Sequence, residues 1–298
     1  MRIFVTGATG FIGSAIVQEL ITAGHRVVGL VRSDAGAKSL VAAGAEVYRG
    51  DLEDLDSLRS GAAHSDAVIH TAFNHDFSKY VANCEADRQA IEALGDALAG
   101  TAKLLIVTSG VGMANSVPGV LATENDLPAS SKLVPRAASE EAAASVAGRG
   151  VRVAIVRLPQ VHDTVKQGLV TYAIQVAREK GVSAYVGDGH GRWPAAHRLD
   201  TGRLYRLALE KADSGDRFHA VAEEGVPLRE IADAIGRGLN VPVVSITPEE
   251  STKHFGWLGA FVGRDVPASS AQTRDKLGWN PKGPGLISDL ENMRYYPA

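Results

Sequence analysis

Residues 1–23 read MRIFVTGATGFIGSAIVQELITA. The apolar run that opens this stretch ends at Thr6, and three glycines follow with the spacing G-x-x-G-x-x-G. From Ile12 to Leu20, apolar residues then recur every four residues, which is typical of a helix. The pattern predicts a β-strand that turns tightly into an α-helix, and a second apolar run at residues 25–30 completes a β-α-β unit.

The three glycines would shape this turn as a phosphate cradle. Gly7 would let the backbone turn sharply, Gly10 would let a pyrophosphate approach without meeting a Cβ atom, and Gly13 would let the helix lie close to the strand. The first helical turn would offer free N–H groups and a partial positive charge. We therefore predict that a dinucleotide binds at Gly7, Thr9, Gly10, Phe11, Ile12 and Gly13. The alternative is a glycine-rich turn without a ligand.

The end of the second strand bears on the choice of dinucleotide. In such folds an acidic residue at this point binds the adenosine ribose of NAD, whereas an arginine pairs with the 2′-phosphate of NADP. Here the side chain of Val31 cannot accept a hydrogen bond, and Arg32 and Ser33 follow it. We predict a preference for NADP(H). The alternative is that Arg32 is an exposed loop residue and that Asp34 binds the ribose.

Two further strand ends are expected beside the cofactor. Asp51 and Leu52 follow the third strand, where a carboxylate can accept from the adenine amino group and an apolar side chain can cover the ring. Asp51 can also cap the helix expected over residues 55–63. Small residues after the fourth strand would let the backbone pass the ribose and phosphates, and this segment reads Thr71, Ala72, Phe73.

Composition and charge argue against several classes of protein. The 298 residues carry a net charge of −3, so there is no electrostatic reason to expect nucleic acid or an anionic membrane as a partner. A single cysteine, Cys84, allows no internal disulfide, and the histidines show no zinc-like spacing. No apolar run reaches the roughly 18 residues of a membrane span, and the chain begins directly with a strand. We expect a cytoplasmic protein without a metal.

The alternation of strands and helices predicts a Rossmann-type α/β fold with a doubly wound parallel sheet. We expect residues 1–162 to form this domain, with 195–222 returning to it, and 163–194 together with 223–298 to form a smaller C-terminal substrate lobe. An irregular segment at 113–134 has the length of a functional loop. Four lobe residues are candidates for an aromatic substrate pocket or for the lobe's own core: Trp193, His254, Phe255 and Trp257.

Several motifs stand in a characteristic order: Thr6-Gly7-x-x-Gly10-x-x-Gly13, Gly50-Asp51-Leu52, Val68-Ile69-His70-x-Ala72, Thr108-Ser109, Arg157-Leu158-Pro159-x-Val161 and His197-x-x-Asp200. The combination resembles the NAD(P)-dependent epimerase/dehydratases, which are extended and atypical branches of the short-chain dehydrogenase/reductase superfamily. The resemblance spans nearly the whole chain. It implies hydride transfer on a small-molecule substrate, and it adds four expected cofactor contacts: Thr108, Arg136, Leu158 and Pro159.

The same resemblance shows where this chain departs from the family. The family uses a tyrosine four residues before a lysine to exchange a proton with the substrate oxygen. With Glu140 in register, these two positions hold Lys132 and Arg136. The family has a serine after the fifth strand, and the corresponding position in this chain is Gly110, which follows Ser109. The expected reaction centre is therefore altered while the expected cofactor site is kept.

Four residues are candidates for chemistry: Ser109, Arg136, Asp87 and Lys132. Arg136 can bind the nicotinamide ribose but, with a pKa above about 12, it is no proton donor. Lys132 can act as an acid only if its pKa is lowered by several units. Ser109 or Thr108 can orient a carbonyl, and Asp87, at the position of a family asparagine, can relay a proton. Each candidate also has a purely structural alternative. Lys132 can be an exposed loop residue, and the hydroxyls of Ser109 and Thr108 can hydrogen-bond to backbone groups. Asp87 can form an ion pair with Arg88 or Arg136.

Three other polar residues are expected in structural roles. Asp200 is predicted to cap the helix that starts at Thr201, because aspartate is a favoured N-cap residue. His70 ends a strand and is expected in the core, as is Cys84.

Three functions are compatible with this sequence. The first is an NADP(H)-dependent oxidoreductase that acts on a small carbonyl or hydroxyl compound or on a quinone. The second is a non-catalytic NADP(H)-binding redox sensor, and the third is a nucleotide-sugar epimerase or dehydratase that holds its cofactor tightly. The protein is expected to be a monomer, or a homodimer formed through the helices over residues 79–98 and 135–147.

Overall fold

The computed structural model describes residues 1–114 and 119–295, so part of the irregular segment expected at 113–134 lies outside the described residues. Within them, the central sheet has seven parallel strands in the order β10-β6-β5-β4-β1-β2-β3. These strands are β1 (Arg2–Thr6), β2 (Arg26–Val31), β3 (Glu46–Arg49), β4 (Ala67–His70), β5 (Leu104–Gly110), β6 (Arg152–Leu158) and β10 (Arg217–His219). The predicted Rossmann-type sheet is confirmed, and its strand order reverses between β1 and β4, where such sheets bind ligands.

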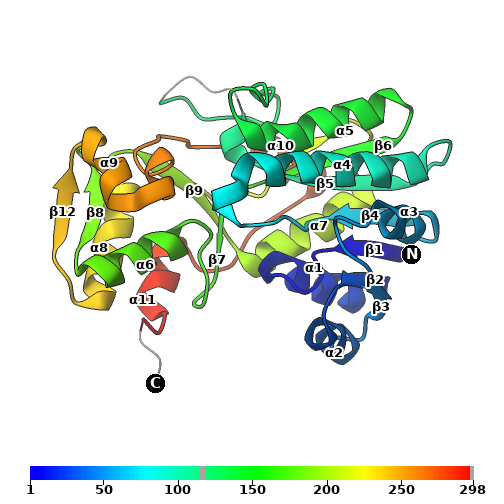
Figure 1. Ribbon diagram of the computed structural model, residues 1–298, viewed down its shortest axis with the longest axis horizontal. Helices are drawn as coiled ribbons and strands as arrows, with labels where there is room; N and C mark the ends of the chain where they lie inside the picture. The colour runs from blue at the N-terminus through cyan, green and yellow to red at the C-terminus, as the bar shows by residue number, and fades with distance from the viewer. Residues whose placement is uncertain (115–118, 296–298) are drawn as a thin grey trace.

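Helices cover both faces of this sheet (Figure 1). One face carries α1 (Phe11–Thr22), α2 (Asp34–Ala42) and α7 (Arg198–Lys211), and the other carries α3 (Leu55–Ala63), α4 (Tyr80–Leu98) and α5 (Ala138–Gly148). Because both faces are buried, the central strands are almost continuously apolar rather than alternating. Helices α1 and α7 pack so closely that a Cβ atom on Gly202 would lie 3.0 Å from the carbonyl oxygen of Ala15.

Most of the remaining elements form a smaller lobe at the side of the sheet (Figure 1). Strands β7 (Gln160–His162), β9 (Arg192–His197) and β11 (Glu223–Pro227) form one small sheet, and β8 (Ser183–Val186) pairs with β12 (Val243–Ile246) in another. A separate hydrophobic core lies among α6 (Val170–Lys180), α8 (Leu228–Leu239), α9 (Pro248–Phe255) and α11 (Leu286–Asn292).

One C-terminal segment packs against the central sheet instead of the lobe. Helix α10 (Ala271–Leu277) contacts α7 and β10, and both Leu277 and Trp279 are buried in the core beneath α1 and α7. The indole N–H of Trp279 donates to the carbonyl oxygen of Asp200 at 2.9 Å. The expected ranges had placed this segment in the lobe, because its few apolar residues give no sign of which core they join.

The predicted cap of α7 is wrong. Helix α7 starts at Arg198, where the His197 side chain accepts from the N–H of Leu199. The carboxylate of Asp200 accepts instead from the backbone N–H groups of Lys282 and Gly283, at 2.9 and 2.6 Å. The capping role left open for Asp51 is taken by Asp54 at the start of α3. Several residues near each helix start are suitable caps, and tertiary contacts decide which is used.

Among the described residues, no helix combines the length and apolar character needed to cross a bilayer. The same residues contain no cluster of histidine, cysteine or carboxylate side chains suited to a metal ion.

Candidate functional site

The turn between β1 and α1 is shaped by its glycines. Gly7 has a φ of +69°, and a Cβ atom there would lie 2.7 Å from the backbone nitrogen of Ala72. A Cβ atom on Gly13 would lie 2.0 Å from the carbonyl oxygen of Gly7, so only glycine lets the helix lie this close. Gly10 is the N-cap of α1 and, among the described side chains, none caps the helix. The first N–H groups of α1 are therefore free for an anion.

The end of β4 is held against this turn. The hydroxyl of Thr71 donates to the carbonyl oxygen of Thr6 at 2.7 Å, and the N–H of Ala72 donates to the Thr6 hydroxyl at 3.3 Å. These bonds place the backbone of residues 71–73 directly beside the glycine turn. Exposed Thr9 and half-buried Phe11 and Ile12 complete the expected phosphate contacts.

Two cations that the sequence analysis missed lie at the same end of α1. The Arg198 guanidinium lies 5.1 Å from the centre of the Phe11 ring and donates to the Ser14 hydroxyl at 3.3 Å and to Asp163 at 3.0 Å. The Lys166 ammonium lies 5.9 Å from the same ring. These charges add to the positive end of the helix and suit a pyrophosphate. Both residues are distant from the glycine motif in sequence: Arg198 begins α7, which packs on α1, and Lys166 lies in the segment between residues 162 and 170.

The end of β2 presents two exposed ion pairs. The Arg32 side chain is 78% exposed and donates to a carboxylate oxygen of Asp51 at 3.4 Å. Ser33 caps α2, and Asp34, which is 88% exposed, forms an ion pair with Arg49. Both Arg32 and the alternative ribose ligand, Asp34, are therefore within reach of a ligand, and each already has a partner of opposite charge.

A buried polar network joins β1, β4, α4 and the residues before α5. The ring of His70 lies 2.8 Å from the Thr6 hydroxyl through Nδ1 and 3.0 Å from Asp87 through Nε2. The other carboxylate oxygen of Asp87 accepts from Arg136 at 2.8 Å and from the Ser139 hydroxyl. Of the two partners considered for Asp87, Arg88 and Arg136, the ion pair is with Arg136, and His70 is buried as predicted.

This network fixes the position and charge of Arg136, which lies in the short helix η3 (Pro135–Ala137). Burial works against ionisation of Asp87, but the Arg136 charge and the hydrogen bond from His70 outweigh it and hold the pKa of Asp87 below its ordinary value. The guanidinium also donates to the carbonyl oxygen of Thr108 at 3.2 Å and lies 4.3 Å from the centre of the Phe73 ring. Arg136 is thus a fixed cation beside residues 71–73.

Comparison with known proteins agrees with this geometry. The model of the NAD dependent epimerase/dehydratase family matches residues 3–222. The chain belongs to this family. It is 50% identical to an uncharacterized protein of Schizosaccharomyces pombe over 99% of this chain and all of the relative, and 45% identical to an uncharacterized protein of Saccharomyces cerevisiae over 97% and 98% of the two chains. Its fold resembles dTDP-glucose 4,6-dehydratase from Streptomyces venezuelae with a TM-score of 0.78, at 20% identity over 99% of this chain and 97% of the other.

The residues predicted for the reaction centre lie in different surroundings. Lys132, the residue predicted to stand at the family's tyrosine position, lies exposed in a turn before η3. Ser109 is buried at the end of β5, and its hydroxyl has no hydrogen-bond partner among the described residues. Its neighbour Thr108 shares a hydrogen bond of 2.6 Å with Tyr205. Tyr80, at the start of α4, offers no ready acid either, because burial raises its pKa to about 12.

The remaining expected contacts lie at strand ends around the same edge of the sheet. Leu52 is half-buried after β3, and Leu158 and Pro159 are half-buried where β6 ends. Strand β6 is tied to α5 by a bidentate pair in which Arg157 donates twice to Glu140, each time at 2.8 Å. The pair is fully buried and fixes the helix that follows Arg136.

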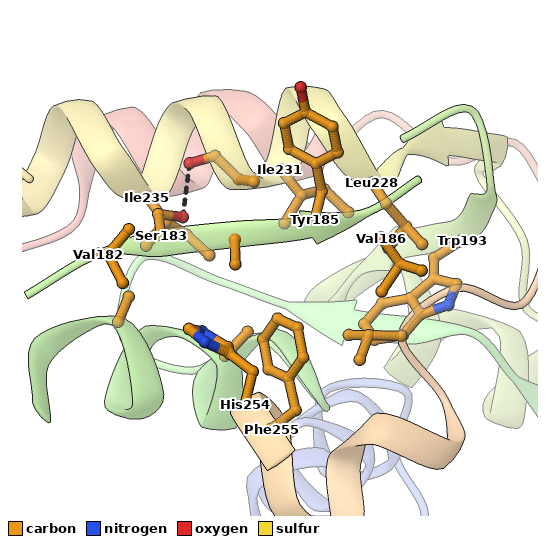
Figure 2. A pocket seen from close by; sticks show the side chains of 15 residues that line it. Val182, Ser183, Tyr185, Val186, Trp193, Leu228, Ile231, Ile235, His254 and Phe255 are labelled. Atoms are coloured by element: carbon orange, nitrogen blue, oxygen red, sulfur yellow. Dashed lines mark hydrogen bonds between the residues drawn. The ribbon is translucent and has the colours of Figure 1, made fainter. Parts of the chain in front are cut away.

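The pocket in the lobe is narrow, with an accessible volume of about 20 Å³, which has room for about one water molecule. Trp193, His254 and Phe255 line it, and Figure 2 shows His254 and Phe255 pointing toward β8. These residues therefore belong to the lobe's core rather than to a substrate pocket. Trp257 is not among the lining residues, and its ring stacks on Phe77.

Proposed function

We propose that this family member is an NADP(H)-dependent oxidoreductase that reduces a small carbonyl compound or a quinone. The observation that carries the proposal is the combination at the sheet edge of a glycine turn without a side-chain cap and an exposed guanidinium at the end of β2. The turn offers N–H groups to a pyrophosphate, and Arg32 offers a bidentate partner to a third phosphate. Asp51 and Leu52 would contact the adenine.

The preference for NADP(H) over NAD(H) rests on the state of Asp34. Asp34, the alternative ribose ligand, is paired with Arg49 at the start of α2, so the guanidinium of Arg49 would compete with the ribose hydroxyls for this carboxylate. Arg49 also donates to the carbonyl oxygen of Arg32, so two guanidinium groups lie at this corner. The two guanidinium groups would attract a 2′-phosphate, whereas an unphosphorylated ribose would gain little binding free energy from them.

At the reaction centre this chain supplies charge and orientation rather than a strong acid. Bound NADPH would supply a hydride. Arg136 would hold the nicotinamide ribose or stabilise negative charge on the substrate oxygen, and Asp87 would act as a positioning residue that keeps the guanidinium in place. The unpartnered hydroxyl of Ser109 would orient the carbonyl, and water would supply the proton.

Among the described residues around Arg136, we identify no side chain suited to act as a strong acid, and this bears on the class of substrate. General acid catalysis contributes about 10²- to 10⁴-fold in rate. Carbonyl groups that accept a hydride readily, such as quinones and conjugated ketones, depend least on that contribution. We therefore expect activated, conjugated acceptors to be reduced faster than simple ketones.

The test follows NADPH absorbance with the purified protein and a panel of aldehydes, ketones and quinones. We expect saturable NADPH binding and the fastest turnover on conjugated acceptors. Saturable binding without turnover on any member would overturn the proposal in favour of the redox sensor. Conversion of UDP-glucose or dTDP-glucose without net consumption of NADPH would instead support an epimerase or dehydratase. Size measurement in solution would test the predicted monomer or homodimer in the same preparation.

A further inference from the structure

A cleft lies beside β10, at one edge of the central sheet. It is lined by residues of β10 and of the turn before it, by α10, and by the loop that contains Glu124. Its accessible volume of about 340 Å³ falls within the range of small-molecule sites, which is about 300–1,000 Å³. In the sheet, strands β6, β5 and β4 stand between β10 and β1. The cleft is therefore separate from the glycine turn that ends β1.

Among the described residues, five charged side chains line this cleft, and two of them pair with each other. The Lys276 ammonium contacts both carboxylate oxygens of Asp216, at 2.8 and 2.7 Å. The other three are Arg217, Glu124 and Asp275. One guanidinium and two carboxylates are therefore left to interact with a ligand.

Arg217 presents a guanidinium that makes no hydrogen bond within the described part of the chain, and its Nε atom is buried. This Nε lies 3.9 Å from the carboxylate of Glu140, which already accepts two hydrogen bonds from Arg157. The Arg217 side chain is 29% exposed and lines the cleft. Its N–H groups are thus available to a carboxylate, which is the group that a guanidinium binds in bidentate fashion.

Glu124 and Asp275 present two carboxylates that form no ion pair with any residue that the structure describes. Glu124 is 3% exposed, and one of its oxygens accepts from the backbone N–H and the hydroxyl of Thr273, at 2.8 and 2.7 Å. Its other oxygen is buried without a hydrogen-bond partner among those residues. Burying an unpaired carboxylate is costly, so a cationic group beside it would be stabilising. Asp275 is exposed on α10 and marks the outer side of the cleft.

The histidine nearby, His219, does not supply the missing positive charge. Its Nδ1 lies 2.8 Å from the carbonyl oxygen of Ser269, so this nitrogen carries a proton and donates it. Its Nε2 lies 3.3 Å from the guanidinium of Arg157, which can only donate, so this nitrogen accepts. The imidazole is therefore neutral, and the carboxylate of Glu124 is left without a cation.

We propose that this cleft binds a basic α-amino acid, such as L-arginine or L-lysine. Its α-carboxylate would bind Arg217, and its two cationic groups would bind Glu124 and Asp275. Three carboxylates and two cations give the cleft a net charge of −1, which complements the charge of +1 on such a ligand at neutral pH. The amide side chains of Asn125 and Gln272 also line the cleft and can hydrogen-bond to the ligand. The site does not depend on the oxidoreductase function proposed above.

Calorimetric titration of the wild-type protein with three matched ligands tests the proposed site. L-arginine carries all three charged groups, agmatine lacks the carboxylate, and L-citrulline has an uncharged side chain of almost the same shape. We expect saturable binding of L-arginine and affinities at least about tenfold weaker for the other two, because each lacks one charged hydrogen-bonding partner. Equal affinities for the three ligands, or no saturable binding of either L-arginine or L-lysine, would overturn the proposal.

Two variants locate the binding within the cleft. Arg217→Gln should weaken L-arginine binding about tenfold and leave agmatine binding unchanged, because agmatine has no carboxylate. Glu124→Gln keeps an oxygen for Thr273 and should weaken the binding of both ligands, while the Tm of the ligand-free protein stays equal to or above that of wild type, since an unpaired amide costs less to bury than a carboxylate.

The control is Arg149→Gln, which removes an exposed arginine outside the cleft and should change neither affinity. Unchanged L-arginine binding in folded Arg217→Gln and Glu124→Gln would overturn the site. The Kd of NADPH should be the same in all three variants. Binding of L-arginine without binding of NADPH would keep this site and reject the proposed oxidoreductase, and the reverse result would reject this site alone.

Discussion

Replacing Asp87 by asparagine removes the counter-charge of Arg136 while keeping the size of the side chain. The Asp87 side chain is 2% exposed and the Arg136 side chain 14%, so water cannot replace the lost partner. Removing one partner of a buried ion pair costs about 3–5 kcal/mol, and the slight exposure of Arg136 favours the lower end. We expect Asp87→Asn to lower the free energy of unfolding by about 3 kcal/mol, which corresponds to a fall in Tm of roughly 6 °C for a chain of this size.

The matched control is Asp96→Asn, the same chemical change on the same helix. Asp96 pairs with Arg149, but both side chains are 45% exposed, so the loss should be about 0.5 kcal/mol or less. Thermal unfolding of both variants and of wild type, followed by circular dichroism, measures the difference. A Tm for Asp87→Asn within 1 °C of the control would refute the reasoning that a buried charge pair fixes Arg136.

The pH dependence gives the same prediction an independent readout. Because the pKa of Asp87 is held below its ordinary value, the stabilisation is fully present above a pH of about 4 and is lost as the pH falls through the lowered pKa. The difference in Tm between wild type and Asp87→Asn should therefore shrink below that pH. A constant difference down to strongly acidic pH would show that the charge of Asp87 is not the cause.

Three further outcomes are expected. Arg32→Ala should weaken NADPH binding about tenfold without changing NADH binding, measured by calorimetry, since one charged hydrogen-bonding partner is lost. Gly13→Ala should abolish NADPH binding and lower Tm, because the added Cβ atom would collide with the backbone. The control is Gly148→Ala, whose added Cβ atom would have no other atom within 4 Å and should change neither quantity. Burial lowers the pKa of His162 and outweighs its bond to Asp289, so the unfolded chain binds a proton more readily below about pH 6.5. Acidification from pH 7.5 to 5.5 should therefore lower the wild-type Tm, and His162→Gln should show a smaller fall.

The cofactor turn was predictable because its signal is local. The spacing of Gly7, Gly10 and Gly13 reflects contacts within one β-strand, one turn and one helix, and each steric requirement acts over a few residues. The parallel sheet was predictable for a similar reason, since strands buried on both faces are apolar along their length.

The rest of the site depends on contacts between distant segments. Arg198 reaches α1 from a helix that begins far along the chain, and no local pattern marks it as a partner of Ser14. The stack of Phe77 on Trp257 joins residues on different parts of the molecule, whereas the sequence left Trp257 open between a substrate pocket and the lobe's core. The predicted cap at Asp200 was wrong because that carboxylate binds the backbone near Gly283, a contact that only the tertiary fold creates.

The central claim is that the β1–α1 turn and Arg32 together bind NADP(H). Its most direct test is a calorimetric titration of the wild-type protein with NADPH and, separately, with NADH in the same buffer. The account predicts saturable binding of both, with a Kd for NADPH at least about tenfold lower. Equal or tighter binding of NADH, or no saturable binding of either nucleotide, would contradict it.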